Sequence, residues 1–198
     1  QLLKYDFTIL DETQRISAVE ERTIEEGDLA FYNSDLYFAN VTEEGEERIY
    51  KIKPEGGMRA EFATGGSFRM SPDGRYMVIL ESAGIGADDE ETVNNTSLKL
   101  KNMSTGEEAY LVKDRYIVSF DWAPNGILYY TEGNDASAEE EYGFTLFSFN
   151  IETKELTECV DMVMADFFTT PDPNTLYLPY MYISDETRIR ATYQLDLR

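Results

Sequence analysis

Histidine is absent from this 198-residue chain, and cysteine occurs once, as Cys159. Without histidine, the chain can build neither a catalytic triad with an imidazole base nor an imidazole metal site. A single cysteine cannot form an internal disulfide. No apolar run approaches the ~18 residues that a membrane-spanning helix needs, so we expect no membrane insertion. These absences exclude several large classes of enzyme and of membrane protein.

Basic residues are scarce as well. Lys and Arg number 17 against 39 Asp and Glu, which gives a formal net charge of -22. Binding to nucleic acid requires Lys and Arg clusters that displace counterions from the phosphates, and the sequence has none. Nucleic acid is therefore not an expected partner. The charge favours a soluble surface, and it also suits a cationic protein partner or calcium.

A Ser-Pro-Asp-Gly turn between two apolar runs is the most informative stretch of the chain, "FRMSPDGRYMVILES" at 68–82. Pro72 sets φ for the second position of a β-turn, and Gly74 can adopt the left-handed conformation that returns the chain. Related turns follow at roughly 50-residue spacing, "APNG" at Pro124 and "TPDPN" at Pro171. The last turn has no glycine, and we expect Asn174 to take the left-handed conformation there.

A second pattern recurs between these turns. "LKLKNMSTGEE" from residue 98 alternates Leu98 and Leu100 with Lys99 and Lys101, which predicts a strand with one buried face; "IYKIK" from 49 and "LFSFN" from 146 alternate similarly. "YMVIL" at 76–80 and "ILYY" at 127–130 are continuously apolar, as expected for strands buried on both faces. One unit is therefore four antiparallel strands in about 45 to 50 residues, the period of a β-propeller blade. A β-sandwich is the alternative, but it does not require this periodicity.

"MSPDGRYMVIL" followed by "LKLKNMSTGEE" resembles the Trp-Asp-like repeats of TolB-type β-propellers, which also build the propeller domains of prolyl oligopeptidase-type peptidases. The resemblance implies an all-β propeller of four-stranded antiparallel blades, with about four blades in this chain. We predict one propeller over residues 1–198. It comprises N-terminal outer strands at 1–27, blades at 28–66, 67–115 and 116–163, and an incomplete blade at 164–198. Either residues 3–19 close a four-bladed ring, or the chain is part of a larger ring.

Two long acidic loops, residues 82–97 and 132–143, occupy the same place in successive units. Dense carboxylate oxygens could hold calcium, although neither loop has the spacing of an EF-hand. A solvated loop is the favoured interpretation, and a protein-binding loop is a third. We expect no other cofactor. The weak calcium candidates are Asp88, Asp89, Glu90, Asp135, Glu139 and Glu140.

Three residues that lie two or three positions before a turn proline are the predicted binding residues: Arg69, Asp121 and Trp122. They belong to inner strands, which border the central channel where propellers often bind ligands. Trp122 could serve as a stacking platform for a sugar, but its place in the repeat favours a core position between blades. A glycosidase would need a second carboxylate, and Asp166 is the candidate partner of Asp121. The two residues occupy different positions in their units, so a salt-linked or edge carboxylate is the favoured interpretation.

The favoured function is a non-catalytic binding module rather than an enzyme, because the chain lacks histidine and contains no catalytic motif. A protein partner is expected, and the sequence identifies no small-molecule ligand. The resemblance implies a bacterial, extracytoplasmic location, periplasmic or at the cell surface. Two alternatives stay open. One is the gating propeller of a prolyl oligopeptidase-type serine peptidase, and the other is a propeller lectin or glycosidase.

Overall fold

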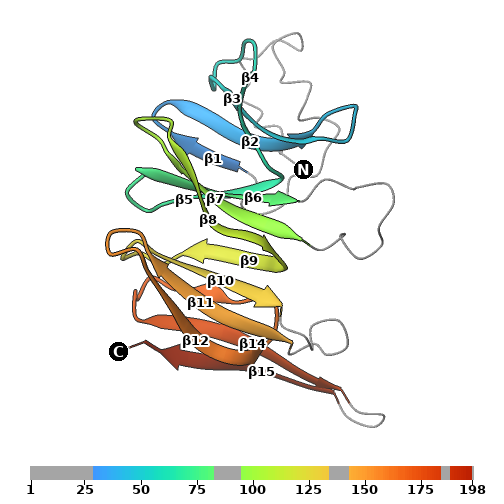
Figure 1. The fold of residues 1–198 in the computed structure, drawn as a ribbon, viewed down its shortest axis with the longest axis vertical. Coiled ribbons are helices and arrows are strands. Elements are labelled where there is room, and N and C mark those ends of the chain that lie inside the picture. Colours follow the sequence, from blue (N-terminus) through green and yellow to red (C-terminus); the bar gives the residue numbers. More distant parts are fainter. Residues whose placement is uncertain (1–28, 83–94, 134–142, 184–187, 198) are drawn as a thin grey trace.

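The computed structural model describes residues 29–82, 95–133, 143–183 and 188–197. All regular structure in these ranges is β-strand, arranged in four antiparallel sheets (Figure 1). In each sheet the strands are neighbours in the order of the sequence. In the described ranges, no helix is long and apolar enough to cross a membrane.

Three sheets have four strands and the fourth has three. The first two sheets contain β1 (Leu29–Tyr32), β2 (Asp35–Val41), β3 (Glu47–Ile52) and β4 (Ala60–Thr64), then β5 (Ser67–Met70), β6 (Tyr76–Ser82), β7 (Thr96–Asn102) and β8 (Glu108–Arg115). The third sheet contains β9 (Ile117–Trp122), β10 (Ile127–Gly133), β11 (Phe144–Asn150) and β12 (Glu155–Val163). The fourth contains β13 (Phe168–Thr169), β14 (Thr175–Ile183) and β15 (Arg188–Asp196).

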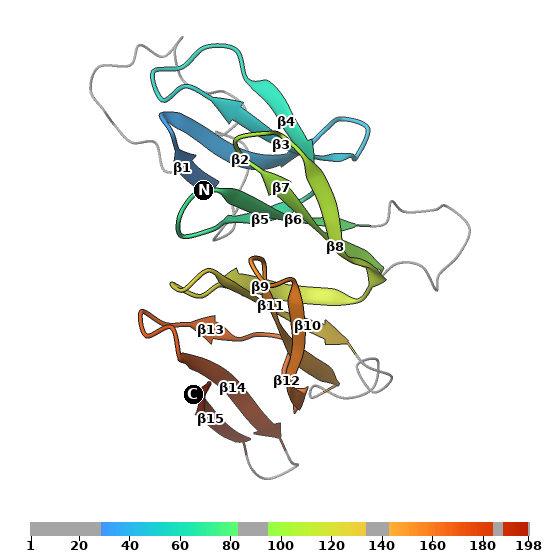
Figure 2. The same ribbon diagram turned by 60° about the vertical axis from the view of Figure 1, so that its left-hand side comes forward.

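The sheets are stacked face to face in the order of the sequence, as the blades of a propeller are (Figures 1 and 2). The inner strand β9 contacts the inner strands β5 and β13 of the two neighbouring sheets. The first and fourth sheets lie at opposite ends of the stack (Figure 1). The four described sheets therefore do not close a ring among themselves. The predicted closure through residues 3–19 lies outside the described residues.

The glycine turns have the predicted geometry. Gly74 has φ 69° and Gly126 has φ 82°, both in the left-handed region. In the first of these turns the Asp73 carboxylate accepts hydrogen bonds from the Ser71 hydroxyl at 2.7 Å and from the Arg75 backbone N–H at 3.0 Å. Partial burial alone would raise the pKa of Asp73, but the hydrogen bonds from Arg75 and Ser71 outweigh it and lower that pKa to about 2.

The prediction for Asn174 is wrong, because this residue is not among those with positive φ. The Asp172 side chain closes this turn instead. Its carboxylate accepts hydrogen bonds from the Asn174 N–H at 3.0 Å and from the Thr175 hydroxyl at 3.0 Å. An aspartate whose side chain accepts a hydrogen bond from the backbone N–H two residues later stabilises the turn without positive φ. It therefore takes the place of a left-handed residue here.

The continuously apolar strands are buried on both faces, as predicted. Met77 and Ile79 of β6 belong to the core between the first and second sheets, whereas Val78 belongs to the core between the second and third. In β10, Leu128 faces the second sheet and Tyr129 faces the fourth. These central strands therefore hold neighbouring sheets together by burying apolar area on both sides.

The prediction that β7 has only one buried face is wrong. Leu98 is buried as expected, but Lys99 is only 5% exposed. Its ammonium group forms ion pairs with Glu81 and with Glu108, the latter at 3.1 Å, and donates a hydrogen bond to the Thr64 hydroxyl of the first sheet at 3.0 Å. The polar face of β7 therefore meets another sheet rather than water. Alternation in a sequence cannot show this, because it marks two faces without saying what each one packs against.

This ion cluster makes stability depend on pH. Burial would raise the pKa of Glu81, but hydrogen bonds from Lys99, Thr64 and Tyr110 lower it. Burial would likewise raise the pKa of Glu108, and Lys101 and Lys99 lower it. A carboxylate with a lowered pKa in the folded state stabilises the fold above its ordinary pKa and loses that contribution as pH falls through the lowered value.

We therefore expect the free energy of unfolding, measured with urea, to fall between pH 5 and pH 2, the window set by about 4 for unfolded carboxylates and about 2 for folded Asp73. The variant Asp73→Asn is expected to show a shallower fall, because its turn no longer titrates. A free energy of unfolding that stayed constant or increased as the pH was lowered from 5 to 2 would contradict the lowered pKa values assigned to these carboxylates.

Candidate functional site

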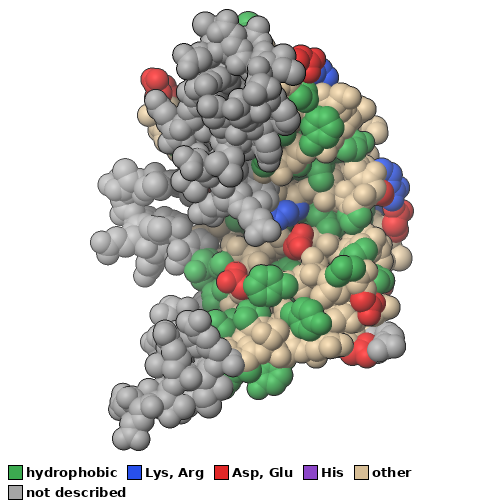
Figure 3. All heavy atoms as spheres, turned by 180° about the vertical axis from the view of Figure 1, so that it is seen from behind, with side chains coloured by type: hydrophobic (Ala, Val, Ile, Leu, Met, Phe, Trp, Pro, Cys, Tyr) green, Lys and Arg blue, Asp and Glu red, His purple; other side chains and the backbone are tan. Residues whose placement is uncertain are grey.

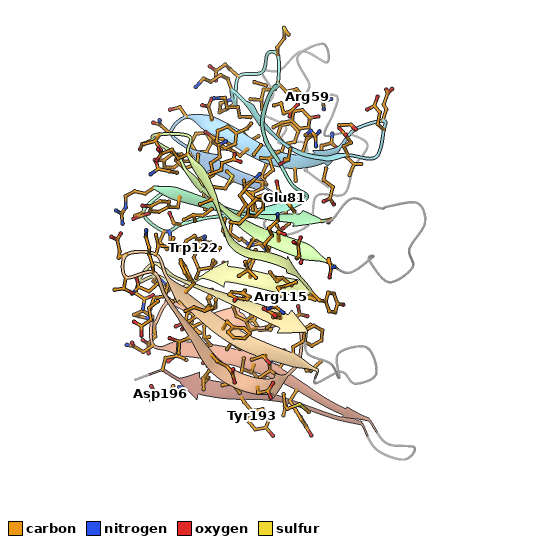
Figure 4. The ribbon with its side chains drawn as sticks, viewed as in Figure 1. Arg59, Glu81, Arg115, Trp122, Tyr193 and Asp196 are labelled. Carbon is orange, nitrogen blue, oxygen red and sulfur yellow. The ribbon has the colours of Figure 1, made fainter. Side chains whose placement is uncertain are left out.

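Trp122, one of the three predicted binding residues, is a core residue between the second and third sheets (Figure 4). Its side chain is only 6% exposed, and its indole N–H donates a hydrogen bond to the backbone oxygen of Arg69 at 3.2 Å. This burial leaves no indole face on which a sugar could stack. The structure thus excludes Trp122 as a stacking platform for a sugar and agrees with its alternative role as a core residue between sheets.

Arg69 and Asp121 lie where the inner strands of neighbouring sheets contact each other. The Arg69 guanidinium lies over the Phe120 ring, 5.5 Å from its centroid. The Asp121 carboxylate accepts hydrogen bonds from the Thr169 hydroxyl at 2.6 Å and from the Trp122 backbone N–H at 2.8 Å. Arg69 thus links the second sheet to the third, and Asp121 links the third to the fourth. The three predicted residues are brought close together, in positions that join neighbouring sheets.

The six calcium candidates of the two acidic loops all lie outside the described residues. In the ranges that the structure describes, no group of three or more His, Cys, Asp or Glu residues could hold a metal ion.

Cys159 is half-buried, and this burial raises the pKa of its thiol. A thiol with a raised pKa is a poor nucleophile.

An apolar groove lies between the outer strand β12 of the third sheet and the strands β14 and β15 of the fourth. Its volume is about 380 Å³. Hydrophobic side chains are also exposed on the opposite face of the molecule, as the view from behind shows (Figure 3). The lining residues are Val160, Met162, Val163, Met164, Leu178, Pro179, Tyr180, Tyr193, Gln194 and Leu195.

Strand register places the groove residues. In the fourth sheet Tyr193 pairs with Leu178, and Leu195 pairs with Leu176. Leu176 and Leu178 belong to the core shared with the third sheet, so Tyr193 and Leu195 also face the third sheet. Tyr193 is still 57% exposed, and its ring lies edge-on to that of Tyr180 with the centroids 5.5 Å apart.

The opposite wall of the groove is shaped by a β-bulge. The pairing of β11 with β12 shifts between Leu146 and Phe144, so that Asp161 and Met162 of β12 together lie opposite the single residue Thr145. Met162 has φ 57°, a conformation that costs a non-glycine residue about 1–2 kcal/mol, and it is 52% exposed. Bulges of this kind often re-aim a side chain beside a functional site. An unbranched, polarizable methionine can adapt to ligands of different shape.

None of the residues that line the groove is charged. Glu155, Glu158 and Asp161 of β12 are all exposed, and β12 itself contains no Lys or Arg. A ligand with apolar side chains would match this lining. Reasoning from sequence missed this groove. The available signal was the predicted incomplete last unit at 164–198, whose sheet has three described strands.

No protein-family model matches the sequence, and no curated protein does. Several solved structures are similar in fold. TolB from Acinetobacter baumannii matches with a TM-score of 0.57 and 11% identity over 87% of this chain and 41% of its own. The acylaminoacyl peptidase of Pyrococcus horikoshii matches with a TM-score of 0.60 and 12% identity over 85% of this chain and 30% of its own.

The β-propeller domain of the Trilobed protease from Pyrococcus furiosus matches with a TM-score of 0.57 and 14% identity, over 85% of this chain and 53% of its own. This chain therefore spans about half, or less, of each of these three structures. At such low identity the similarity establishes the fold alone. It agrees with the stacked four-stranded sheets and the glycine turns described above. The chain has the fold of a TolB-like β-propeller.

Proposed function

We propose that the chain is a non-catalytic binding module that holds a segment of another protein in the groove between β12 and the fourth sheet. The observation that carries this proposal is the exposed apolar lining, with Met162 and Tyr193 at its surface. Apolar side chains gathered in an open groove favour a partner that covers them. The net charge of -22 favours a partner with positive charge.

The chemistry of the described residues supports a binding role over a catalytic one. The Asp121 carboxylate accepts a hydrogen bond from the Thr169 hydroxyl, and burial raises the pKa of the Cys159 thiol. We place this module outside the cytoplasm of a bacterium, at the periplasm or cell surface, on the basis of the resemblance to TolB-type propellers.

A second candidate function is the propeller part of a larger serine peptidase. The similarity to the acylaminoacyl peptidase of Pyrococcus horikoshii favours it. A coding sequence that continues past residue 198 into a segment with a Gly-x-Ser-x-Gly elbow would support this candidate. A stop codon directly after residue 198 would count against it.

Site-specific photocrosslinking tests the binding proposal. A photoreactive phenylalanine analogue is placed at Tyr193 in the groove or, as a control, at Met58, which is 96% exposed in the first sheet's β3–β4 connection. In cells that produce the protein, we expect crosslinked protein adducts from position 193 and not from position 58. Equal adducts at both positions, or none at position 193, would contradict the proposed site.

A further inference from the structure

The bulge of β12 places Met162 in the wall of the groove. In β11, Phe144 and Leu146 belong to the core shared with the fourth sheet, so Thr145 between them faces the other way. The Thr145 hydroxyl donates a hydrogen bond to the Asp161 carboxylate at 2.6 Å. Asp161 therefore fills the position opposite Thr145, and Met162 is the extra residue, which lines the groove. Its positive φ is a strained conformation of the kind that clusters at functional sites.

The thioether of Met162 is accessible to small oxidants, because this residue is 52% exposed. A second methionine, Met164, lines the same groove. Two other methionines serve as references. Met77 is completely buried in the core between the first and second sheets. Met58 is 96% exposed in the first sheet, at the opposite end of the stack from the fourth (Figure 1).

Oxidation by a peroxide would change the chemistry of the groove wall. The sulfur donates an electron pair to one oxygen of hydrogen peroxide, the S–O bond forms as the O–O bond breaks, and a proton transfer releases water. The thioether is thereby oxidised to a sulfoxide, and the peroxide is reduced to water. The sulfoxide oxygen is a strong hydrogen-bond acceptor. An apolar ligand that covered it would bury this oxygen without offering a donor, which costs binding free energy.

We propose that Met162 is a redox-sensitive site that controls binding in the groove. The reduced thioether accepts apolar ligands, and oxidation to the sulfoxide by a peroxide weakens their binding. This inference rests on the proposed function and adds its regulation. Methionine sulfoxide reductases return the sulfoxide to the thioether, so the change is reversible.

The test uses the full chain and the neutral apolar dye Nile red, whose binding is followed by fluorescence. The variant Met162→Leu keeps an apolar, unbranched Cβ at this position and cannot be oxidised. The variant Met162→Gln places a permanent polar group there. Met58→Leu is the matched control at an exposed methionine outside the groove. Tyr193→Ser identifies the part of the dye signal that comes from the groove.

Peptide mass spectrometry after treatment with hydrogen peroxide should show sulfoxide at Met162 and Met58 while Met77 stays reduced. We expect dye affinity to fall by about tenfold or more, which corresponds to about 1.4 kcal/mol, and to recover after treatment with sulfoxide reductases. Met162→Leu should bind the dye equally well with and without peroxide. Met162→Gln should bind weakly without peroxide, and Met58→Leu should remain as sensitive to peroxide as the parent protein.

Other outcomes separate the inference from the proposed function. Sulfoxide at Met162 with unchanged dye affinity would overturn the regulation while the groove remained a binding site. Equal peroxide sensitivity of Met162→Leu and the parent would also overturn it, because Cys159 and the other methionines are present in both. Dye binding that Tyr193→Ser leaves unchanged would overturn the groove as the site of apolar ligands, and crosslinking from position 193 would still decide the proposed protein partner independently.

Discussion

Replacing Lys99 with alanine is expected to lower the free energy of unfolding by about 3–5 kcal/mol, the range for breaking a buried ion pair by removing one partner. Lys99 pairs with Glu81 and Glu108 between the first and second sheets. Without its ammonium group, two partly buried carboxylates would face each other without their shared cation. The loss should be measured by urea unfolding at pH 7.

Lys53→Ala is the matched control. Lys53 also forms an ion pair, with Asp35 at 2.7 Å, but its side chain is 53% exposed. An exposed pair contributes about 0–1 kcal/mol, so this variant should remain close to the parent protein. If both substitutions lowered the free energy of unfolding equally, the Lys99 cluster would be solvated and one face of β7 would be exposed to water.

Replacing Gly74 with alanine should destabilise the protein by about 1–3 kcal/mol more than replacing Gly126, because it adds overpacking to backbone strain. Both glycines have positive φ, which costs alanine about 1–2 kcal/mol at either position. They differ in their surroundings. A Cβ on Gly74 would lie 2.1 Å from the ring of Tyr32, whereas a Cβ on Gly126 meets nothing within 4 Å.

A double-mutant cycle with Tyr32→Ala isolates the clash. Tyr32 belongs to β1 and packs on the core between the first and second sheets, so its ring cannot move away without losing contacts. In the Tyr32→Ala background, Gly74→Ala and Gly126→Ala should cost the same. A persistent difference would show that the penalty at Gly74 comes from the turn itself and not from contact between neighbouring sheets.

Sequence reasoning predicted the features that depend on local chemistry. The turn at Pro72 and Gly74 and the doubly buried strand that contains Val78 follow from residue types a few positions apart, and the structure shows both. The all-β propeller class followed from their recurrence. The repeat was informative because each unit buries its faces only against its neighbours, so that one pattern had to return with each sheet.

Features that depend on contacts between sheets were not predictable in the same way. The alternation of β7 marked Lys99 as polar but did not reveal Thr64 and Glu81 around it. The groove depends on the distance between β12 and β15 and on the absence of a fourth described strand beside β15, which no short motif encodes. The sequence left two roles open for Trp122, a stacking platform for a sugar and a core residue between blades. Only its burial between two sheets distinguishes these roles.

Photocrosslinking from the groove tests the central claim most directly. Tyr193 lines the groove and is 57% exposed, whereas the control residue Met58 is 96% exposed in the first sheet. We expect protein adducts from a photoreactive residue at position 193 and none from position 58. Equal adducts from both positions, or none from position 193, would contradict the proposed binding site.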